Sequence, residues 1–318
     1  MKPLRIGTRS SALALWQANH VRKALAAACG VEPEIIPIRT AGDRLQSTSV
    51  AQVNETIGAE GAKGIFIKEI EDALLSGSVD LAVHSMKDVP TETPSGLAFA
   101  AITRREDPRD CLISRDGLTL EKLPQGARVG TSSQRRQAQL RRHRPDLRVL
   151  DLRGNVDTRL KKVAAGEFDA IVLAVAGVTR LGASHRITEI LSSEVMLPAV
   201  GQGALGIETR ADDRDTSALV ASLDDTETRA CIAAERALLR ELEGGCQIPL
   251  GAWAYMEGNG EIFFEACVLS PDGAQCVRGE ERGATAHAEA IGENLAGTLI
   301  AAGADKILRV ARRSAGKS

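Results

Sequence analysis

The sequence predicts an α/β protein of two duplicated lobes, followed by a small C-terminal α+β domain. The first observation behind this prediction is an internal repeat, because "RIGTRSSALALWQANHVRKAL" from Arg5 and "RVGTSSQRRQAQLRRHRPDL" from Arg128 begin alike. The second is a change of pattern after about residue 222, where short strands separated by Gly-containing turns replace the alternation of strands and helices. The 318 residues are enough for two or three domains, at roughly 100 to 200 residues each.

The two repeats contain the same parts in the same order. A short strand leads to Gly-Thr, then to serines that can cap a helix, and then to a helix of about three to four turns. Later, "ALLSGSVDLAV" (73–83) and "KVAAGEFDAIV" (162–172) each contain a helix end, a turn with Gly and Asp, and a buried strand. Strands that alternate with helices form parallel sheets, so we expect ligands at strand C-termini and helix N-termini.

The same patterns predict where the domains divide. We expect the first lobe over residues 1–104 together with 198–221, the second lobe over 105–197, and the third domain over 222–318. The segment "LPAVGQGALGIE" (197–208) reads as a hinge followed by a strand that returns to the first lobe, and two such crossings would give a cleft that can close. In the third domain we expect a helix over 226–243, strands near 250–257, 260–269 and 274–282, and a last helix over about 286–302.

Composition excludes several classes of protein. Lys and Arg total 40 against 42 Asp and Glu, so the net charge of −2 gives no general attraction to nucleic acid or to anionic membranes. The longest apolar run, residues 170–178, falls short of the ~18 residues that span a bilayer, and we interpret it as a buried strand. The N-terminus is a poor secretion signal, and the six cysteines form neither a CxxC motif nor a Cys/His cluster. We therefore expect a cytoplasmic protein with reduced thiols and no metal site.

Basic residues concentrate in the second lobe. Residues 128–162 hold eleven Lys or Arg against three acids. Arg135 and Arg136 fall in the first turn of a helix, Arg153 at a strand end, and Arg159 in the first turn of the next helix, where they can bind carboxylates or phosphates. The neighbouring arginines of "RRHR" fit a solvated helix face. A nucleic-acid surface is a third reading, but 3% aromatic residues offer no stacking platform.

Two loops contain residues suited to chemistry. In "DLAVHSMKDVP", a strand over 80–83 leads into a loop with Lys87 and Asp88, and this carboxylate is either part of a surface ion pair or a stabiliser of a cation. In "ELEGGCQIP", Cys246 follows two glycines, has no histidine within thirty positions and has no second cysteine nearby. A buried cysteine would be an ordinary small apolar residue, but this loop reads as exposed and flexible.

Five segments, "HSMKDVP", "GTSSQRRQ", "LRGNVDTRL", "LPAVGQGA" and "LEGGCQIP", resemble in that order the hydroxymethylbilane synthase family, also called the porphobilinogen deaminase family. The resemblance implies lobes like those of type II periplasmic binding proteins, and a dipyrromethane cofactor joined to Cys246 by a thioether. It also implies the head-to-tail condensation of four porphobilinogens with loss of ammonia, and the release of hydroxymethylbilane by water. Such a cysteine need not return to a thiolate at each turnover, which accounts for the missing histidine.

The resemblance also implies roles for individual residues. Asp88 matches the catalytic aspartate, which would stabilise the azafulvenium cation left when ammonia departs. Besides Cys246 and Asp88, the residues expected to bind the cofactor are Lys87, Ser133, Arg135, Arg136 and Arg159, and those expected to bind substrate are Arg9, Ser11, Lys63, Arg153 and Arg180. The loop over residues 44–62 is longer than the family pattern, which puts its role as a lid in doubt.

One further class of function stays open at the level of sequence. A two-lobed receptor could close on an anion without catalysis, but such a receptor has no use for a Gly-Gly-Cys loop in a third domain. No heptad pattern or large apolar stripe argues for assembly, so we expect a monomer whose partner is porphobilinogen and which binds neither nucleic acid nor membrane.

Overall fold

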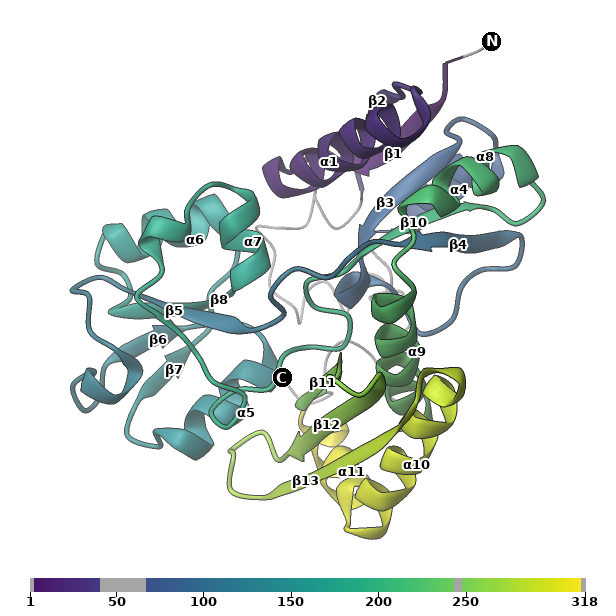
Figure 1. Cartoon of the computed structure of the whole chain (residues 1–318). Helices are drawn as coiled ribbons and strands as arrows, with labels where there is room; N and C mark the ends of the chain where they lie inside the picture. Colours follow the sequence, from purple (N-terminus) through teal and green to yellow (C-terminus); the bar gives the residue numbers. More distant parts are fainter. Residues whose placement is uncertain (1–2, 41–66, 243–247, 316–318) are drawn as a thin grey trace. The chain divides into compact units, whose positions relative to one another are not determined.

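A computed structural model of the chain describes residues 3–40, 67–242 and 248–315 (Figure 1). The chain divides into two compact units. Unit 1 comprises residues 1–106 and 204–229, and unit 2 comprises residues 107–203 and 230–318. The chain therefore leaves unit 1 and returns to it before it enters the last part of unit 2.

Unit 1 is built on one five-stranded sheet in the order β2-β1-β3-β10-β4. Its strands are β1 (Arg5–Arg9), β2 (Glu34–Ile38), β3 (Leu81–Ser85), β4 (Leu97–Ile102) and β10 (Leu205–Arg210). Strand β1 is parallel to β2 and β3, whereas β10 is antiparallel to both β3 and β4. The prediction that the segment after residue 197 supplies a returning strand to the first lobe is therefore confirmed.

Helices cover both faces of this sheet. They are α1 (Ala12–Cys29), α4 (Lys68–Leu75) and α8 (Arg214–Val220), with short 3₁₀ turns η1 (Met86–Asp88) and η4 (Ala221–Leu223). The α1 side chains of Ala18, Val21 and Leu25 pack with β-strand residues and with Val220 of α8, while Ile70 and Leu74 of α4 pack in a separate cluster. Two apolar clusters on one sheet give the three-layered arrangement expected of a parallel α/β lobe.

Unit 2 contains a second five-stranded sheet in the order β7-β6-β8-β5-β9. Its strands are β5 (Asp110–Ser114), β6 (Arg128–Gly130), β7 (Arg148–Leu150), β8 (Ala170–Ala174) and β9 (Glu189–Ile190). Strands β7, β6 and β8 are parallel, as are β2, β1 and β3 in unit 1. Next to β8 in the sheet lies β5, which is antiparallel to both β8 and β9. Both lobes thus share one topology, and the predicted duplication is confirmed.

The helices of this lobe are α5 (Gln134–His143), α6 (Val156–Ala164) and α7 (Val175–Arg180), with 3₁₀ turns η2 (Leu120–Lys122) and η3 (Ser184–Arg186). Interpreting residues 170–178 as one strand was wrong beyond Ala174, because the chain turns there into α7. The pairing of β8 with β5 ends at Ala174, and the helix that follows still buries Val175 and Val178. An apolar run alone does not distinguish these two ways of burying the same residues.

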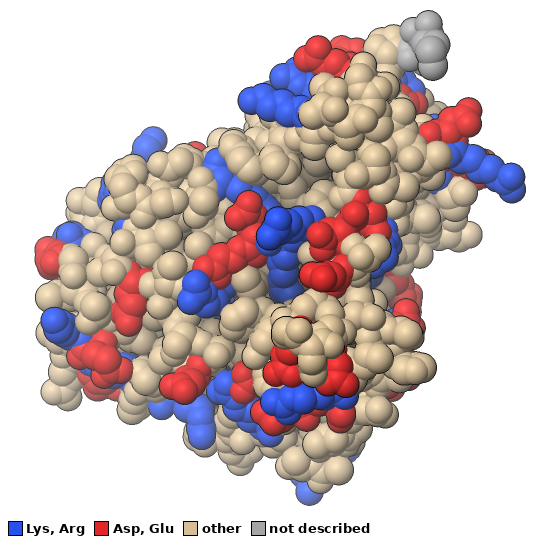
Figure 2. Space-filling view, viewed as in Figure 1, with Lys and Arg blue, Asp and Glu red and all other residues tan. Residues whose placement is uncertain are grey.

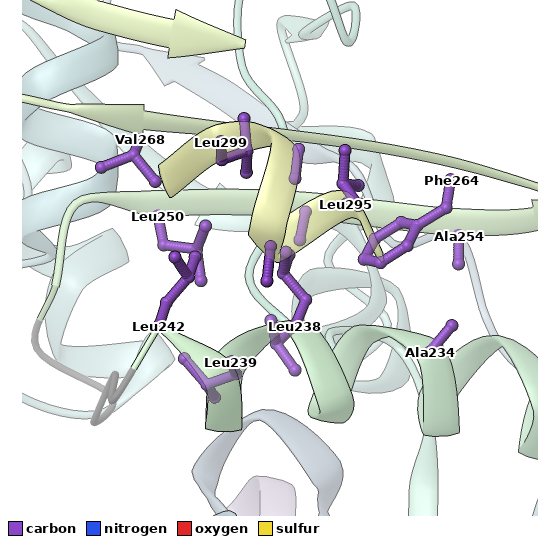
Figure 3. Packing of buried hydrophobic residues seen from close by; sticks show 14 of the residues in the cluster. Ala234, Leu238, Leu239, Leu242, Leu250, Ala254, Phe264, Val268, Leu295 and Leu299 are labelled. Carbon is purple, nitrogen blue, oxygen red and sulfur yellow. The ribbon is translucent and has the colours of Figure 1, made fainter. Parts of the chain in front are cut away.

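The last part of the chain forms a three-stranded antiparallel sheet with three helices. The strands are β11 (Leu250–Met256), β12 (Glu261–Leu269) and β13 (Cys276–Ala284), in that order across the sheet, and the helices are α9 (Thr226–Glu241), α10 (Ala288–Ala301) and α11 (Ala304–Ala315), with η5 (Thr285–His287) before α10. Leu238 of α9, Phe264 of β12 and Leu295 of α10 meet in its core (Figure 3). The helix α11 was not predicted, although its buried Ile307, Leu308 and Ala311 have helical spacing.

The predicted fold class of two duplicated α/β lobes and a small α+β domain is confirmed. The boundaries of the three domains stay a prediction, and α5 of the second lobe packs on the small sheet through a cluster of Ala138, Leu197, Cys267 and Leu269. Among the described residues, no helix has the length and apolar character needed to cross a membrane. On the face drawn in Figure 2, Lys and Arg side chains lie among Asp and Glu side chains.

Candidate functional site

The beginning of α5 organises the basic part of unit 2. Ser133 is the N-cap residue, and its Oγ accepts a hydrogen bond from the backbone N–H of Arg136 at 3.4 Å. Ser132 Oγ donates to the carbonyl of Leu152 at 2.9 Å and accepts from the N–H of Leu152 at 3.0 Å. These contacts hold the segment after β6 against the segment after β7, so both loops lie at the C-terminal edge of the parallel strands.

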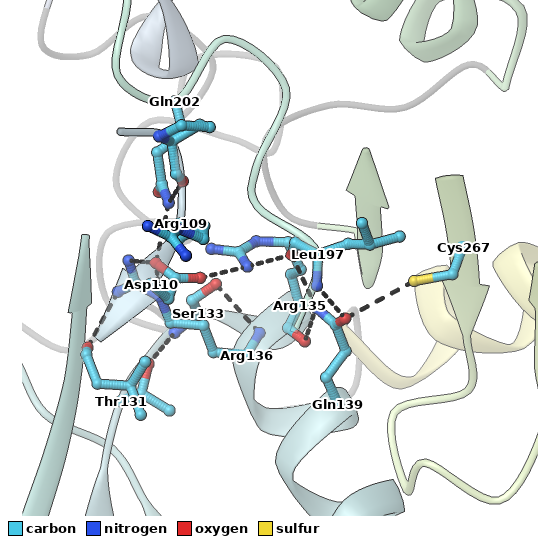
Figure 4. A network of polar contacts seen from close by, with 12 residues as sticks. Arg109, Asp110, Thr131, Ser133, Arg135, Arg136, Gln139, Leu197, Gln202 and Cys267 are labelled. Atoms are coloured by element: carbon cyan, nitrogen blue, oxygen red, sulfur yellow. Dashed lines mark hydrogen bonds and ion pairs between the residues drawn. The ribbon is translucent and has the colours of Figure 1, made fainter. Parts of the chain in front are cut away.

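Arg135 and Arg136 in the first turn of α5 both bind Asp110 (Figure 4). The Arg135 Nη1 to Asp110 Oδ2 distance is 2.6 Å, and the Arg136 Nη2 to Asp110 Oδ1 distance is 2.7 Å. All three side chains are buried, with Asp110 fully inaccessible. Gln202 Nε2 donates to Asp110 Oδ1 at 2.9 Å, and Arg135 Nη1 also donates to the carbonyl of Leu197 at 2.6 Å.

This cluster is ionised and carries excess positive charge. Burial by itself raises the pKa of Asp110, but the charges and hydrogen bonds of Arg135 and Arg136 outweigh burial and hold that pKa far below its usual value. Two guanidinium groups share one carboxylate, so one positive charge remains uncompensated within the group of three. A positive charge at a helix N-terminus favours the binding of an anion.

Arg153 and Arg159 lie at the same edge of the sheet. Arg153 follows β7 and Arg159 is in the first turn of α6, and both side chains are partly exposed. Arg159 Nε donates to the carbonyl of Gly154 at 2.7 Å. Gly154 has φ of +108°, and a Cβ there would come within 2.8 Å of Thr158 Cγ2, so the loop requires glycine.

Arg180 occupies the end of α7 and is 7% exposed. Its Nη2 donates to the carbonyl of Gly203 at 2.7 Å, which binds α7 to the segment over residues 197–203. The same segment is held by Glu235, whose Oε2 accepts the N–H of Gly201 at 2.7 Å and whose Oε1 accepts the N–H of Ala254 at 2.9 Å. Arg180 therefore helps to fix this connecting segment.

In unit 1 the structure places Lys87 and Asp88 on the η1 turn directly after β3. Asp88 is exposed and Lys87 is partly exposed. The preceding Met86 is buried, and its N–H donates to the carbonyl of Ala204 at 3.1 Å. Met86 packs against Gly206 of β10, where an added Cβ would collide with the Met86 sulfur. The turn that carries Asp88 is therefore held against β10 through Met86.

Arg9 and Ser11 lie at the end of the neighbouring strand. Arg9 is the last residue of β1, and Ser11 caps α1 by accepting the N–H of Ala14 at 3.4 Å. Since β1 and β3 are parallel and adjacent, these residues share the C-terminal edge of the sheet with Asp88. Gln17 Nε2 of α1 donates to Ser85 Oγ at 2.9 Å, which links α1 to the end of β3.

Two predicted site residues, Lys63 and Cys246, lie outside the described residues. Sequence reasoning missed Asp110, Gln202 and Gln139, the last of which binds Leu197 through both ends of its amide group. A signal for Asp110 was present, because an acid stands at the start of an apolar strand in a region rich in arginine. Among the described residues there is no group of three His, Cys, Asp or Glu that could hold a metal ion.

The donor set of unit 2 fits a ligand with several carboxylates. Its site residues are guanidinium and hydroxyl groups, and Asp110, the carboxylate that touches Arg135 and Arg136, is fully buried and leaves a positive excess. Guanidinium groups bind carboxylates through paired hydrogen bonds. A dipyrromethane with acetate and propionate side chains, the cofactor expected from the resemblance, has the chemistry that such a set would bind.

Residues 4–218 match the family model "Porphobilinogen deaminase, dipyromethane cofactor binding domain", and residues 229–301 match "Porphobilinogen deaminase, C-terminal domain". Among solved structures, the chain is similar to the methionine-binding protein MetQ, with 11% identity, a TM-score of 0.43, and coverage of 73% of this chain and 94% of that one.

Two further solved structures are similar. One is a periplasmic substrate-binding protein of an ABC transporter from Coxiella burnetii, with 14% identity, a TM-score of 0.42, and coverage of 73% and 96% of the two chains. The other is the BvgS periplasmic VFT2 domain from Bordetella pertussis, with 16% identity, a TM-score of 0.39, and coverage of 69% and 86%.

Proposed function

Since the chain belongs to the porphobilinogen deaminase family, we propose that it makes hydroxymethylbilane with Asp88 as the catalytic carboxylate and a dipyrromethane cofactor held by Cys246. The family supplies the reaction, a transfer that joins four porphobilinogens head to tail and releases one ammonia for each. The family models cover residues 4–218 and 229–301, and this coverage is the observation that carries the function.

Asp88 suits the role of the carboxylate that assists the loss of ammonia. It is exposed at the end of β3, on a turn whose Met86 is buried, so the carboxylate is accessible on a supported backbone. Departure of ammonia leaves a cation on the substrate, and a nearby carboxylate stabilises that charge more strongly than it stabilises the neutral substrate. The same carboxylate can accept and return a proton at the pyrrole.

The arginines of unit 2 would bind the carboxylates of the cofactor and of the growing product. Arg153 and Arg159 are partly exposed and can reach a ligand, and we assign substrate to the first and cofactor to the second. Arg135 and Arg136 would add the excess charge of their cluster with Asp110, with Ser133 at the helix start beside them. Every added pyrrole brings an acetate and a propionate, so the demand for positive charge rises as the chain grows.

In unit 1 we assign Lys87 to the cofactor, and Arg9 and Ser11 to substrate. All three lie at the C-terminal edge of the parallel strands, where α/β sheets bind their ligands. Arg180 and Lys63 complete the set proposed to bind substrate. Lysine and arginine at these positions would bind carboxylates in the way proposed for Arg153.

Dipyrromethane, when bound, supplies the terminal pyrrole to which the first substrate is joined. The thioether at Cys246 would hold it through all turnovers, so the sulfur does not have to be regenerated as a thiolate. Glycine has no side chain, so the two glycines that precede Cys246 in the sequence would leave room for bulky pyrroles. Once four units have been added, water would release the product and leave the cofactor on the cysteine.

We further propose that the enzyme is a cytoplasmic monomer whose partner is porphobilinogen. The absence of a CxxC motif or a Cys/His cluster from the sequence supports a reducing compartment. The near-neutral net charge of −2 gives no general attraction to nucleic acid or to anionic membranes. Neither nucleic acid nor membrane is an expected partner. Sedimentation at several protein concentrations tests the oligomeric state, and a mass that rises with concentration would contradict a monomer.

A two-lobed receptor that closes on an anion without chemistry is the competing function. The experiment that separates the two is incubation with porphobilinogen, followed by measurement of released ammonia and of the linear tetrapyrrole by mass spectrometry. The enzyme yields both, in a ratio of about four ammonia molecules to one product, as the proposed condensation of four substrates requires. A receptor binds porphobilinogen and yields neither.

A further inference from the structure

Two cysteines of unit 2 lie on the same face of the small sheet. In the pairing of β12 with β13, Cys267 is opposite Arg278 and Cys276 is opposite Leu269. Cys267 and Cys276 are therefore diagonal neighbours on adjacent strands. Cys267 belongs to the buried cluster that includes Ala138 of α5, and Cys276 packs against that cluster. Diagonal neighbours in an antiparallel pair lie roughly 7–8 Å apart, with side chains that can reach each other.

The two thiols have different surroundings. Cys267 is 3% exposed, and its Sγ donates to Gln139 Oε1 at 3.7 Å. Cys276 is partly exposed, and it is the first residue of β13. An oxidant in solution can thus reach Cys276 and not Cys267.

Cations from two elements act on Cys276. The neighbouring Cys267 thiol and the positive charges of Arg142 on α5 and Arg278 on β13 lower the pKa of Cys276 to about 6, against the opposing effect of burial. The pKa of Cys267 is raised, because it interacts with Cys276 and is buried. Arg278 also binds Glu265 on β12 at 2.6 Å, so its charge is partly shared. A thiolate is the nucleophilic form of cysteine.

We propose that Cys276 is a thiol that reacts with hydroperoxides and that Cys267 is its resolving partner, so that oxidation closes an intrachain disulfide between β12 and β13. Both cysteines lie on one face of the sheet, where Cys276 is accessible to solvent and Cys267 is buried. Redox-active cysteines are commonly accessible and placed beside a resolving thiol.

The chemistry takes two steps, with a hydroperoxide as the oxidant. The Cys276 thiolate attacks the terminal peroxide oxygen, the O–O bond breaks, and the sulfur becomes a sulfenic acid while an alkoxide or hydroxide leaves and takes a proton from solvent to become an alcohol or water. The Cys267 sulfur then attacks the Cys276 sulfur, the S–O bond breaks, and one water leaves with the thiol proton. Two thiols lose two electrons and the peroxide gains them.

Closing the bond requires a small shift of the chain. Disulfides have Cα separations of about 4.4–6.8 Å, slightly below the usual diagonal spacing. Cys276 begins its strand and follows the turn over residues 270–275, which is closed by a 2.9 Å hydrogen bond from the N–H of Ser270 to the carbonyl of Gln275. A residue at a strand end can move without breaking the ladder on both sides.

Cys29 and Cys111 provide internal controls. Cys29 is exposed, and its Sγ contacts Ser222 Oγ at 3.3 Å and the carbonyl of Leu219 at 3.8 Å, both neutral groups. Cys111 is fully buried, and burial raises its pKa to about 12. If exposure alone decided reactivity, Cys29 would be oxidised first. If the charged surroundings decide, Cys276 reacts first although it is less exposed.

The experiment treats the reduced full-length holoprotein with a small excess of hydrogen peroxide at pH 7 and follows each cysteine by peptide mapping. The sequence between Glu241 and Arg278 has no Lys or Arg, so trypsin leaves Cys246, Cys267 and Cys276 in one peptide. Asp272 is the acidic residue between the last two, and a second cleavage there separates them unless a disulfide joins the halves.

We expect the two halves to stay joined until a reductant is added, with a mass lower by two hydrogens, at peroxide doses that leave Cys29 reduced. Cys276→Ser should leave Cys267 as a free thiol, and Cys267→Ser should leave a sulfenic acid on Cys276 that dimedone traps. Oxidation of Cys29 before Cys276 overturns the proposal, and so does a wild-type sulfenic acid at Cys276 that never closes to the disulfide.

Discussion

Asp110 and Arg135 form a buried ion pair, with 2.6 Å between the carboxylate oxygen and the guanidinium nitrogen. Arg136 shares the same carboxylate at 2.7 Å. These residues come from β5 and from the first turn of α5, so a strand and the helix covering it are joined through a group of charges inside the lobe. The arginines proposed to act on the cofactor are therefore also part of the lobe's internal structure.

Replacement of Asp110 by Asn should lower the free energy of unfolding by about 3–5 kcal/mol, because two buried guanidinium groups lose their counter-ion. Asp169→Asn is the matched control. Asp169 pairs with Arg128 at 3.0 Å in a partly exposed setting, so its loss should cost only about 1 kcal/mol. Urea unfolding measures both. Equal losses in the two variants would show that the buried cluster contributes no more than a surface pair.

The same pair predicts a dependence of stability on pH. The pKa of Asp110 is lower in the folded protein than in the unfolded chain, so its contribution is complete above the unfolded pKa of about 4 and is lost as pH falls further. The difference in unfolding free energy between wild type and Asp110→Asn should be largest near neutral pH and should shrink below about pH 4. A difference that stays constant down to pH 3 would contradict an ionised Asp110.

Asp88→Asn should abolish turnover and leave the fold and the attached cofactor in place. The amide cannot offset a developing positive charge or accept a proton, and removal of such a group typically costs about 100-fold or more in kcat. Ammonia release measures turnover, intact mass measures the cofactor, and Asp212→Asn, an exposed aspartate in the same unit, is the control. Ordinary activity in Asp88→Asn would remove Asp88 from the mechanism.

Arg153→Ala and Arg159→Ala should fail in different ways. Removal of an arginine whose ion pair with a ligand carboxylate becomes buried in the complex costs about 2–5 kcal/mol of binding free energy. For Arg153 the loss should appear as a higher KM for porphobilinogen with the cofactor still attached, and for Arg159 as a reduced fraction of protein carrying the cofactor. Arg148→Ala, on the exposed start of β7, should change neither quantity. Wild-type values for both Arg153→Ala and Arg159→Ala would show that neither arginine binds substrate or cofactor.

Much of the fold could be predicted from local signals in the sequence. The repeat of strand, Gly-Thr, capping serine and helix predicted β1 with α1 and β6 with α5, because capping and strand-end chemistry are local. The end of β8 at Ala174 and the helix α11 were not predicted, because each depends on which neighbour the chain finds in the folded lobe.

The candidate site was predicted less completely than the fold. The motifs located Asp88 and the arginines, but they gave no sign that Arg135 and Arg136 share Asp110, which lies 25 positions from Arg135 along the chain. A partner so distant in sequence is visible only when the sheet brings β5 beneath α5. The proximity of Cys267 to Cys276 was not predicted for the same reason, since it depends on the register of β12 and β13.

The attachment of the cofactor to Cys246 is tested by the intact mass of the purified protein, followed by mapping of the tryptic peptide that contains Cys246. We expect a mass excess equal to two linked pyrrole units on Cys246, and no such excess in a Cys246→Ser protein. An unmodified Cys246 after the protein has been supplied with porphobilinogen would contradict the assigned attachment of the cofactor and the mechanism built on it.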